Sequence, residues 1–207
     1  MKMCPKIILE GTRLTFKTET AFALNRHPRI VGPRKYEYHS PIVSGEWCAF
    51  TNFPWGRGLI NFEEAETDMA METFGVWARL WELQRYYSWI VDRFHWSTIA
   101  YQRTQGREFD FAWLEERLKA VGFRVVLLSR STESFEAARA RRLKVSGKPD
   151  QYDDLGLFVR EQETIRGIAE KSILPWREFD VSDNDIDRVC DEIADWLEET
   201  GGLYADY

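Results

Sequence analysis

The sequence lacks any apolar run long enough to cross a bilayer, which takes about 20 consecutive apolar residues. Its first six residues, Met-Lys-Met-Cys-Pro-Lys, are followed by only a few apolar residues before Glu10. A secretory signal needs a longer apolar centre than this. We therefore expect a cytoplasmic protein that has no membrane partner.

Cysteine is scarce, with only Cys4, Cys48 and Cys190 in the chain. The number is odd and the spacing is wide, which indicates neither a disulfide framework nor a zinc site. The three histidines show no metal-ligand spacing either. Cys190 falls on the apolar stripe of the last helical segment, so we expect it in the core.

An excess of positive charge is also missing. Lys plus Arg number 28 against 34 Asp plus Glu, which gives a formal net charge of -6. This balance disfavours nucleic acid or an anionic membrane as a general partner, without excluding a local basic pocket for phosphates. The 207 residues, 44% of them hydrophobic, suffice for one globular domain with a substantial core.

Apolar runs and helical patterns alternate along the chain. Strands are expected at 7–9, 29–31, 87–92, 123–128 and 176–181. Helices are expected at 17–25, 66–85, 109–121, 133–144 and 154–171, with a last one that Ser182 caps. This alternation predicts an α/β fold with a mostly parallel sheet of five strands and helices on both faces. Ligands of such sheets bind beyond the carboxyl ends of the strands.

Residues 32–66 are irregular and unusually aromatic for a loop. They form either a structured, substrate-facing insertion or an outer layer that packs on the core. The sequence favours neither interpretation. Trp55, within Phe-Pro-Trp-Gly-Arg-Gly at 53–58, has the best claim among the tryptophans to a binding role.

The segment from Gly11 to Thr18 resembles a phosphate-binding loop after a buried strand. The usual pattern is G-x-x-x-x-G-K-[ST], and Phe16 stands in place of its second glycine. In such a loop Lys17 contacts the β- and γ-phosphates, and the Thr18 hydroxyl ligates Mg²⁺. The alternative is an ordinary strand-turn-helix with Lys17 on the surface.

A second candidate motif is Asp92-Arg93, at the end of a predicted strand. The two side chains either form a simple ion pair or place a carboxylate near a transferring phosphoryl group and a guanidinium on a phosphate. Parallel strands would bring this motif and the phosphate loop to the same edge of the sheet.

Three segments together resemble the thymidylate kinase family. Residues 92–102 read Asp-Arg-Phe-His-Trp-Ser-Thr-Ile-Ala-Tyr-Gln, which is similar to the family's Asp-Arg-Tyr motif with its later Ser and Tyr-Gln-like ending. Glu10-Gly11 precedes the phosphate loop as in the family, and 133–142 looks like the helix before a mobile lid. The resemblance implies a three-layer P-loop kinase fold in one domain over 1–207, with an insertion at about 32–66 and a lid at about 139–154.

The resemblance also implies roles for individual residues. ATP and Mg²⁺ would be bound by Gly11, Arg13, Thr15, Phe16, Lys17 and Thr18, with Asp92 near the metal or the acceptor oxygen. Lys17, Asp92, Arg93, Arg139 and Arg142 would serve catalysis, with Arg141 a further lid cation. The acceptor would contact Arg79, Arg93, Ser97, Tyr101, Gln102 and Trp55. At least one arginine of 139–142 is expected on a solvated helix face.

This sequence departs from the family where the acceptor is bound. The loop residues Thr12-Arg13-Leu14 include no acid, although family members usually carry one there that contacts the acceptor sugar. We therefore expect a phosphotransferase that moves the ATP γ-phosphoryl to a nucleotide, with an altered acceptor. The alternatives are a kinase of a nucleoside or other hydroxylated acceptor (a small molecule or a modified DNA base), or a non-catalytic nucleotide-binding or interaction protein. The apolar helix expected at 66–85 is compatible with packing against a second subunit in a homodimer.

Overall fold

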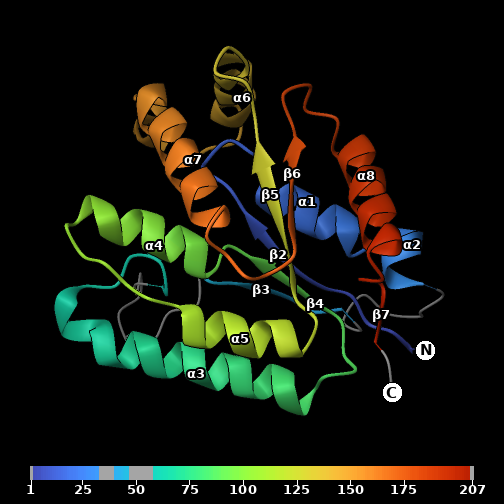
Figure 1. Ribbon diagram of the computed structural model, residues 1–207. Coiled ribbons are helices and arrows are strands. Elements are labelled where there is room, and N and C mark those ends of the chain that lie inside the picture. The colour runs from blue at the N-terminus through green and yellow to red at the C-terminus, as the bar shows by residue number, and fades with distance from the viewer. Residues whose placement is uncertain (1, 33–39, 47–57, 206–207) are drawn as a thin grey trace.

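The computed structural model describes residues 2–32, 40–46 and 58–205 (Figure 1). A sheet of five parallel strands lies at its centre, in the order β3-β4-β2-β5-β6. The strands are β2 Lys6–Glu10, β3 Ile42–Ser44, β4 Trp89–Asp92, β5 Arg124–Ser129 and β6 Trp176–Asp180. Two short strands, β1 Lys2–Met3 and β7 Tyr204–Ala205, pair antiparallel near the termini. The predicted five-stranded parallel sheet is confirmed.

Helices cover both faces of this sheet (Figure 1). One face carries α1 Lys17–Leu24 and α8 Ile186–Glu199, which pack on one set of strand side chains. The other face carries α3 Thr67–Leu83, α4 His95–Thr104, α5 Ala112–Ala120 and α7 Leu155–Ala169. Ile7 and Leu9 face the first group while Ile8 faces the second, as the alternation of a strand requires.

The carboxyl ends of β5 and β6 point toward α6 Ser134–Leu143, the helix expected before a lid. Two short 3₁₀ turns complete the described elements, η2 Glu64–Glu66 and η3 Pro149–Tyr152. Among the described residues, no helix combines the length and apolarity that a membrane span requires.

Two local predictions were wrong. The expected strand at 29–31 is part of the short helix α2 Pro28–Val31, because Pro28 in its first turn presets a helical φ. The edge strand instead lies at β3. The last helix is capped by Asp185, whose side chain accepts from the amide of Arg188, whereas the Ser182 hydroxyl bonds to Asp180.

Helix α3 has a buried face and an exposed apolar stripe. Its Trp81 and Phe74 rings pack edge-to-face on Phe94 at 5.2 and 4.9 Å between centroids. Its outer side exposes Met69, Val76, Leu80 and Leu83. Dimerisation through this helix stays a prediction. Cys190 is buried, as expected.

A buried carboxylate ties three elements together beneath α4. Glu115 on α5 accepts hydrogen bonds from His95 Nε2 at 2.9 Å, from Trp96 Nε1 at 3.1 Å and from the amide of Ile173 at 2.9 Å. Burial alone would raise the pKa of Glu115, but the bond to His95 and its charge, together with the other donors, lower it to about 2.

Replacing this carboxylate by an amide tests its contribution. The folded pKa of Glu115 lies below its ordinary value of 4.5, so its stabilisation is present above pH 4.5 and is lost as pH falls toward 2. We expect Glu115→Gln to lower the free energy of unfolding by up to about 3 kcal/mol at pH 7. Denaturant unfolding measured from pH 7 to pH 2 should show this difference narrow below pH 4.5. Glu116→Gln, on the exposed side of α5, is the matched control. A difference that does not change with pH would contradict the assignment.

Candidate functional site

The turn after β2 packs too tightly against β5 for any side chain at its first position. Gly11 has φ 143°, and a Cβ there would lie 2.3 Å from the carbonyl oxygen of Leu128. Leu14 and Phe16 adopt left-handed φ values of 68° and 54°, each of which costs about 1 kcal/mol or more outside glycine. Phe16 therefore takes the left-handed conformation that a glycine adopts readily.

The loop leaves a run of backbone donors open. No amide from Arg13 to Thr18 donates a hydrogen bond to any residue in the part of the chain that the structure describes. This run ends at the N-terminus of α1, where helix amides and the helix dipole favour an anion. The predicted phosphate loop thus has the backbone of an anion-binding site.

Lys17 is not the surface lysine of the alternative interpretation. Its side chain is buried, and its ammonium donates to the carbonyl of Thr12 at 2.6 Å and to Thr15 Oγ1 at 3.3 Å. Burial, followed by the nearby charge of Arg93, lowers the pKa of Lys17 to about 7. Three carboxylates oppose this effect, those of Asp92, Glu161 and Glu46.

The two residues expected to hold a metal meet directly. Thr18 lies in the first turn of α1, and Asp92 is the last residue of β4. The Thr18 hydroxyl donates a hydrogen bond to Asp92 Oδ2 at 2.6 Å. β2 and β4 are adjacent parallel strands, so their carboxyl ends bring the loop and the aspartate together. A hydroxyl and a carboxylate suit Mg²⁺, which retains several waters and takes few protein ligands. Within the described ranges, no group of three or more His, Cys, Asp or Glu side chains could hold a metal.

Arg93 is buried beside the same loop in a left-handed backbone conformation, φ 62°. Its guanidinium donates to the carbonyl of Gly11 at 3.4 Å, and its Nε lies 3.8 Å from a Glu46 carboxylate oxygen. Burial acts to lower the pKa of Arg93, but surrounding carboxylates outweigh it and raise that pKa. These are Glu161, Glu46, Glu10 and Asp92.

Glu10 positions this turn, a role that the sequence analysis missed. Its buried carboxylate accepts from the amides of Phe94, Trp96 and Ser97 and from the Ser97 hydroxyl at 2.5 Å. Glu10, at the end of β2, therefore accepts the hydrogen bonds of amides at the N-terminus of α4, the helix that follows β4. The Ser97 hydroxyl points to Glu10, and the Gln102 amide bonds the carbonyls of Ile60 and Phe62.

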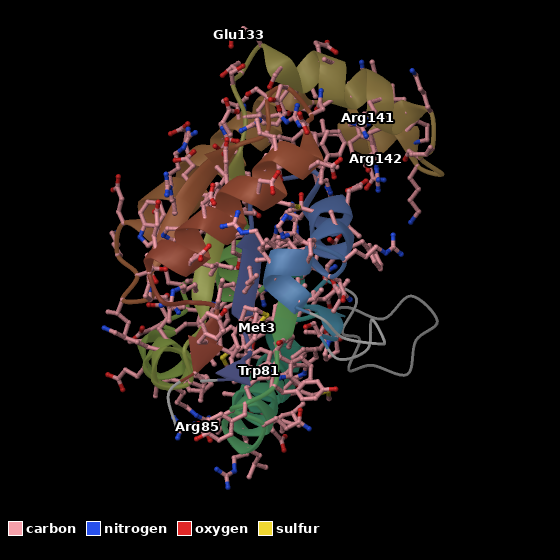
Figure 2. All side chains as sticks on the ribbon, turned by 90° about the vertical axis from the view of Figure 1, so that its right-hand side faces the viewer. Met3, Trp81, Arg85, Glu133, Arg141 and Arg142 are labelled. Atoms are coloured by element: carbon pink, nitrogen blue, oxygen red, sulfur yellow. The ribbon has the colours of Figure 1, made fainter. Side chains whose placement is uncertain are left out.

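The lid arginines have protein partners. Arg139 pairs with Asp153 at 2.9 Å, and Arg142 reaches the Tyr152 hydroxyl at 3.1 Å and Glu19 on α1 at 3.3 Å. Figure 2 shows Arg141 and Arg142 on α6 at one end of the molecule and Trp81 of α3 toward the other. Arg142 thus joins the lid helix to the helix after the phosphate loop.

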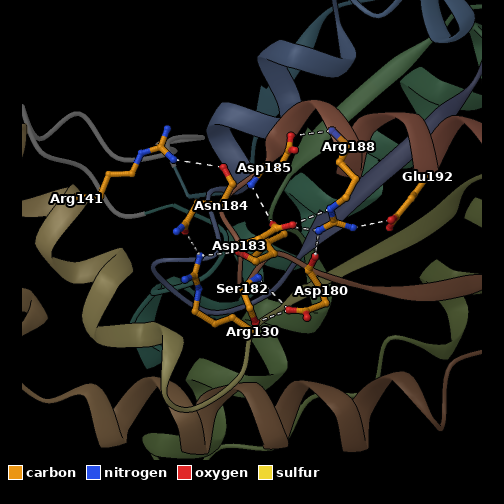
Figure 3. A network of polar contacts seen from close by, with 10 residues as sticks. Arg130, Arg141, Asp180, Ser182, Asp183, Asn184, Asp185, Arg188 and Glu192 are labelled. Carbon is orange, nitrogen blue, oxygen red and sulfur yellow. Dashed lines mark hydrogen bonds and ion pairs between the residues drawn. The ribbon is translucent and has the colours of Figure 1, made fainter.

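The Phe16 ring is contacted by two guanidinium groups. Arg130 stacks 5.1 Å and Arg141 4.9 Å from its centroid. Burial lowers the pKa of Arg130 to about 10. Both arginines also converge on Asn184 in the turn after β6 (Figure 3), with Arg130 donating to its side chain at 3.0 Å. Phe16 therefore connects the phosphate loop to α6 and to the β6–α8 turn.

Some predicted residues do not join this cluster. Arg79 is exposed on α3 and pairs with Glu82 at 3.2 Å. Arg13 and Tyr101 are exposed, and Trp55 lies outside the described residues. Glu161 on α7 belongs to the cluster although it was not predicted, since it accepts a hydrogen bond from the Thr12 hydroxyl. An isolated glutamate on an amphipathic helix carries no motif that would have revealed it.

The burial of Lys17 gives a test that needs no ligand. The unfolded lysine has a pKa near 10.5 and the folded one near 7, so burial opposes folding below pH 10.5, most strongly below pH 7. We expect Lys17→Met to raise the free energy of unfolding at pH 7 by about 2–4 kcal/mol. Thermal unfolding from pH 6 to 10 should show the gain shrink as pH rises. Lys17→Arg, which stays charged, should show no gain. A gain independent of pH would contradict a desolvated ammonium.

Several solved structures are similar to this chain in fold. The YorR protein of Bacillus subtilis, in complex with phosphorylated GDP, has 21% identity and a TM-score of 0.61, covering 97% of this chain and 99% of its own. Thymidylate kinase of Candida albicans has 15% identity and a TM-score of 0.53, covering 98% of this chain and 94% of its own.

Deoxyadenosine kinase from M. mycoides, with dCMP and a flexible dCDP bound, has 11% identity and a TM-score of 0.53, covering 94% of this chain and 99% of its own. No protein-family model matches the chain, and no curated protein sequence matches it. Likeness at these identities establishes the architecture: the chain has the three-layer α/β fold of P-loop kinases.

Proposed function

We propose that this protein is a phosphotransferase that moves the γ-phosphoryl of ATP to a nucleotide. The observation that carries the proposal is the meeting of three features at one sheet edge: a loop of open amides, the buried Lys17, and the hydrogen bond between Thr18 and Asp92. Each part suits one element of a Mg²⁺-nucleoside triphosphate.

The donor phosphates lie along the amides from Arg13 to Thr18. Lys17 gives up its bond to the Thr12 carbonyl and contacts the β- and γ-phosphates, whose charge restores its protonated form. Thr18 and Asp92 would hold Mg²⁺, which would supply positive charge that stabilises the phosphates during transfer. These groups act by position and charge, the main source of catalysis in phosphoryl transfer.

Arg93 lies next to the loop carbonyl of Gly11, within reach of the group that leaves or accepts the phosphoryl. Its rigid backbone and its contact with Glu46 fix the guanidinium in place. Arg139, Arg141 and Arg142 supply further positive charge when the lid closes over the phosphates. Breaking the Arg142–Glu19 pair at 3.3 Å releases one of them for that role.

A nucleotide acceptor is supported by the similar structure described as a thymidylate kinase, whereas the one described as a deoxyadenosine kinase supports a nucleoside. The second candidate is a nucleoside or another hydroxylated acceptor. The absence of an acid in Thr12-Arg13-Leu14, and the carboxylates of Glu46 and Glu161 around Arg93, favour an acceptor region unlike that of thymidylate kinases.

Lys17→Ala tests the donor site. We expect it to abolish ATP turnover, because it removes the one buried cation of the phosphate loop. Steady-state release of ADP measures the loss, with Lys119→Ala on the exposed side of α5 as the matched control. Turnover retained in the Lys17 variant would refute the loop assignment.

Asp92→Asn separates binding from transfer. The amide keeps the size and one oxygen of the carboxylate but loses the charge that a metal requires. We expect MgADP binding, measured by calorimetry, to persist within about tenfold, while phosphoryl transfer falls by about 100-fold or more. Asp187→Asn on the exposed side of α8 serves as the control. An unchanged transfer rate would remove Asp92 from the mechanism, and binding of ATP without transfer to any acceptor would favour a non-catalytic nucleotide-binding protein.

A further inference from the structure

Glu161 differs from the other charged residues around it on α7. Its neighbours form ion pairs away from the phosphate loop, Arg160 with Asp154 and Glu163 with Arg166. Glu161 is half-buried and faces the loop, where it accepts a hydrogen bond from the Thr12 hydroxyl. It is therefore the α7 carboxylate that reaches the candidate site.

This carboxylate acts on two buried cations without touching them. Among the carboxylates that raise the pKa of Arg93, Glu161 has the largest effect. It also opposes the lowering of the pKa of Lys17. Among the described residues, however, no basic nitrogen lies within 4.0 Å of its oxygens. A glutamate that served only to neutralise these cations would be expected to form an ion pair with one of them.

Donor phosphates on the loop would make this position unfavourable for a bare carboxylate. Phosphate oxygens and Glu161 would repel each other unless a cation or a hydrogen-bond donor lay between them. The structure already places a hydroxyl, that of Thr12, against one Glu161 oxygen. The other oxygen has no hydrogen-bond partner among the described residues and is available to a second hydroxyl.

We propose that Glu161 accepts a hydrogen bond from a hydroxyl group of the phosphoryl acceptor and is thereby a specificity-determining residue of this site. The inference rests on the proposed phosphotransferase function and adds a substrate class to it. The acceptor carries a hydroxyl in addition to the group that is phosphorylated. A hydrogen bond to a charged acceptor discriminates against a ligand that lacks the hydroxyl.

The test uses acceptors that differ only in their hydroxyls. Ribonucleosides, their 2′-deoxy and 2′,3′-dideoxy analogues, and the 5′-monophosphates of all three are incubated with MgATP, and the products are separated by chromatography. The proteins are wild type, Glu161→Gln, Glu161→Asp and the matched control Glu163→Gln. We expect Glu161→Gln to lower kcat/KM for the hydroxylated acceptor by about 10- to 100-fold. The preference over the analogue that lacks the hydroxyl should disappear, and Glu161→Asp should restore part of it.

Two readouts separate recognition from a merely structural contact. The dissociation constant for MgADP should change much less in Glu161→Gln than kcat/KM for the hydroxylated acceptor, because Lys17, Thr18 and the loop amides are retained. Thr12→Val removes the same hydrogen bond yet leaves the carboxylate, so it should keep the hydroxyl preference. Equal discrimination in wild type and Glu161→Gln, or equal loss in Thr12→Val, would overturn the proposal.

Failure of the phosphotransferase function gives a different result. If wild type binds MgATP but transfers to no acceptor, that function fails, and calorimetry of the same panel with MgADP-loaded protein decides the role of Glu161. Hydroxyl-dependent binding that is lost in Glu161→Gln supports recognition. Binding that does not depend on the hydroxyl, or no binding, overturns it.

Discussion

The burial of two like charges under one loop is the constraint on which the rest of this site depends. Lys17 and Arg93 are both buried beside the turn after β2, and the charge of Arg93 helps to lower the pKa of Lys17. Burying a cation costs several kcal/mol unless an anion compensates. Carboxylates compensate the burial of Arg93 and raise its pKa, whereas the lowered pKa of Lys17 indicates that its charge is not fully compensated. A polyphosphate along the open amides would supply the missing negative charge. The stability given up at Lys17 fits the proposed phosphate site, in which the cation is in place before a ligand binds.

Several features away from the cations keep them in place. The carbonyl of Leu128 excludes any side chain at Gly11, so the loop has to follow β5 closely before it turns into α1. Glu10 holds the first amides of α4 and thereby fixes the left-handed turn at Arg93. Both contacts join segments that are distant in sequence, and both lie at the carboxyl ends of adjacent parallel strands. Backbone strain at Leu14, Phe16 and Arg93 is concentrated in the same place, as is common where structure serves binding rather than stability.

The sequence sufficed for the parts of the molecule that local patterns determine. Apolar runs predicted β2, β4, β5 and β6. The spacing of Gly11, Lys17 and Thr18 indicated the candidate loop, although Phe16 replaces the second glycine of the usual pattern. The rule that parallel strands share one carboxyl edge placed the loop beside Asp92-Arg93, but the hydrogen bond between Thr18 and Asp92 was seen only in the structure. Glu10 and Glu161 escaped prediction because their partners Phe94 and Thr12 are 84 and 149 residues away, and no periodicity encodes such a pairing. The strand expected at 29–31 failed for a local reason, since Pro28 favours the start of a helix over an extended edge.

Phe16 is best understood from its neighbours rather than from the motif it breaks. A glycine there would relieve strain but would remove the ring on which Arg130 and Arg141 both stack. The ring also packs in a small apolar cluster with Leu14 on the loop and Phe135 on α6. The phosphate loop, the lid helix and the β6–α8 turn are thus parts of one packed unit, and Arg142 adds a second link to α1 through Glu19. Phe16 thus joins the loop to α6 through a side chain that the glycine of the usual pattern does not have.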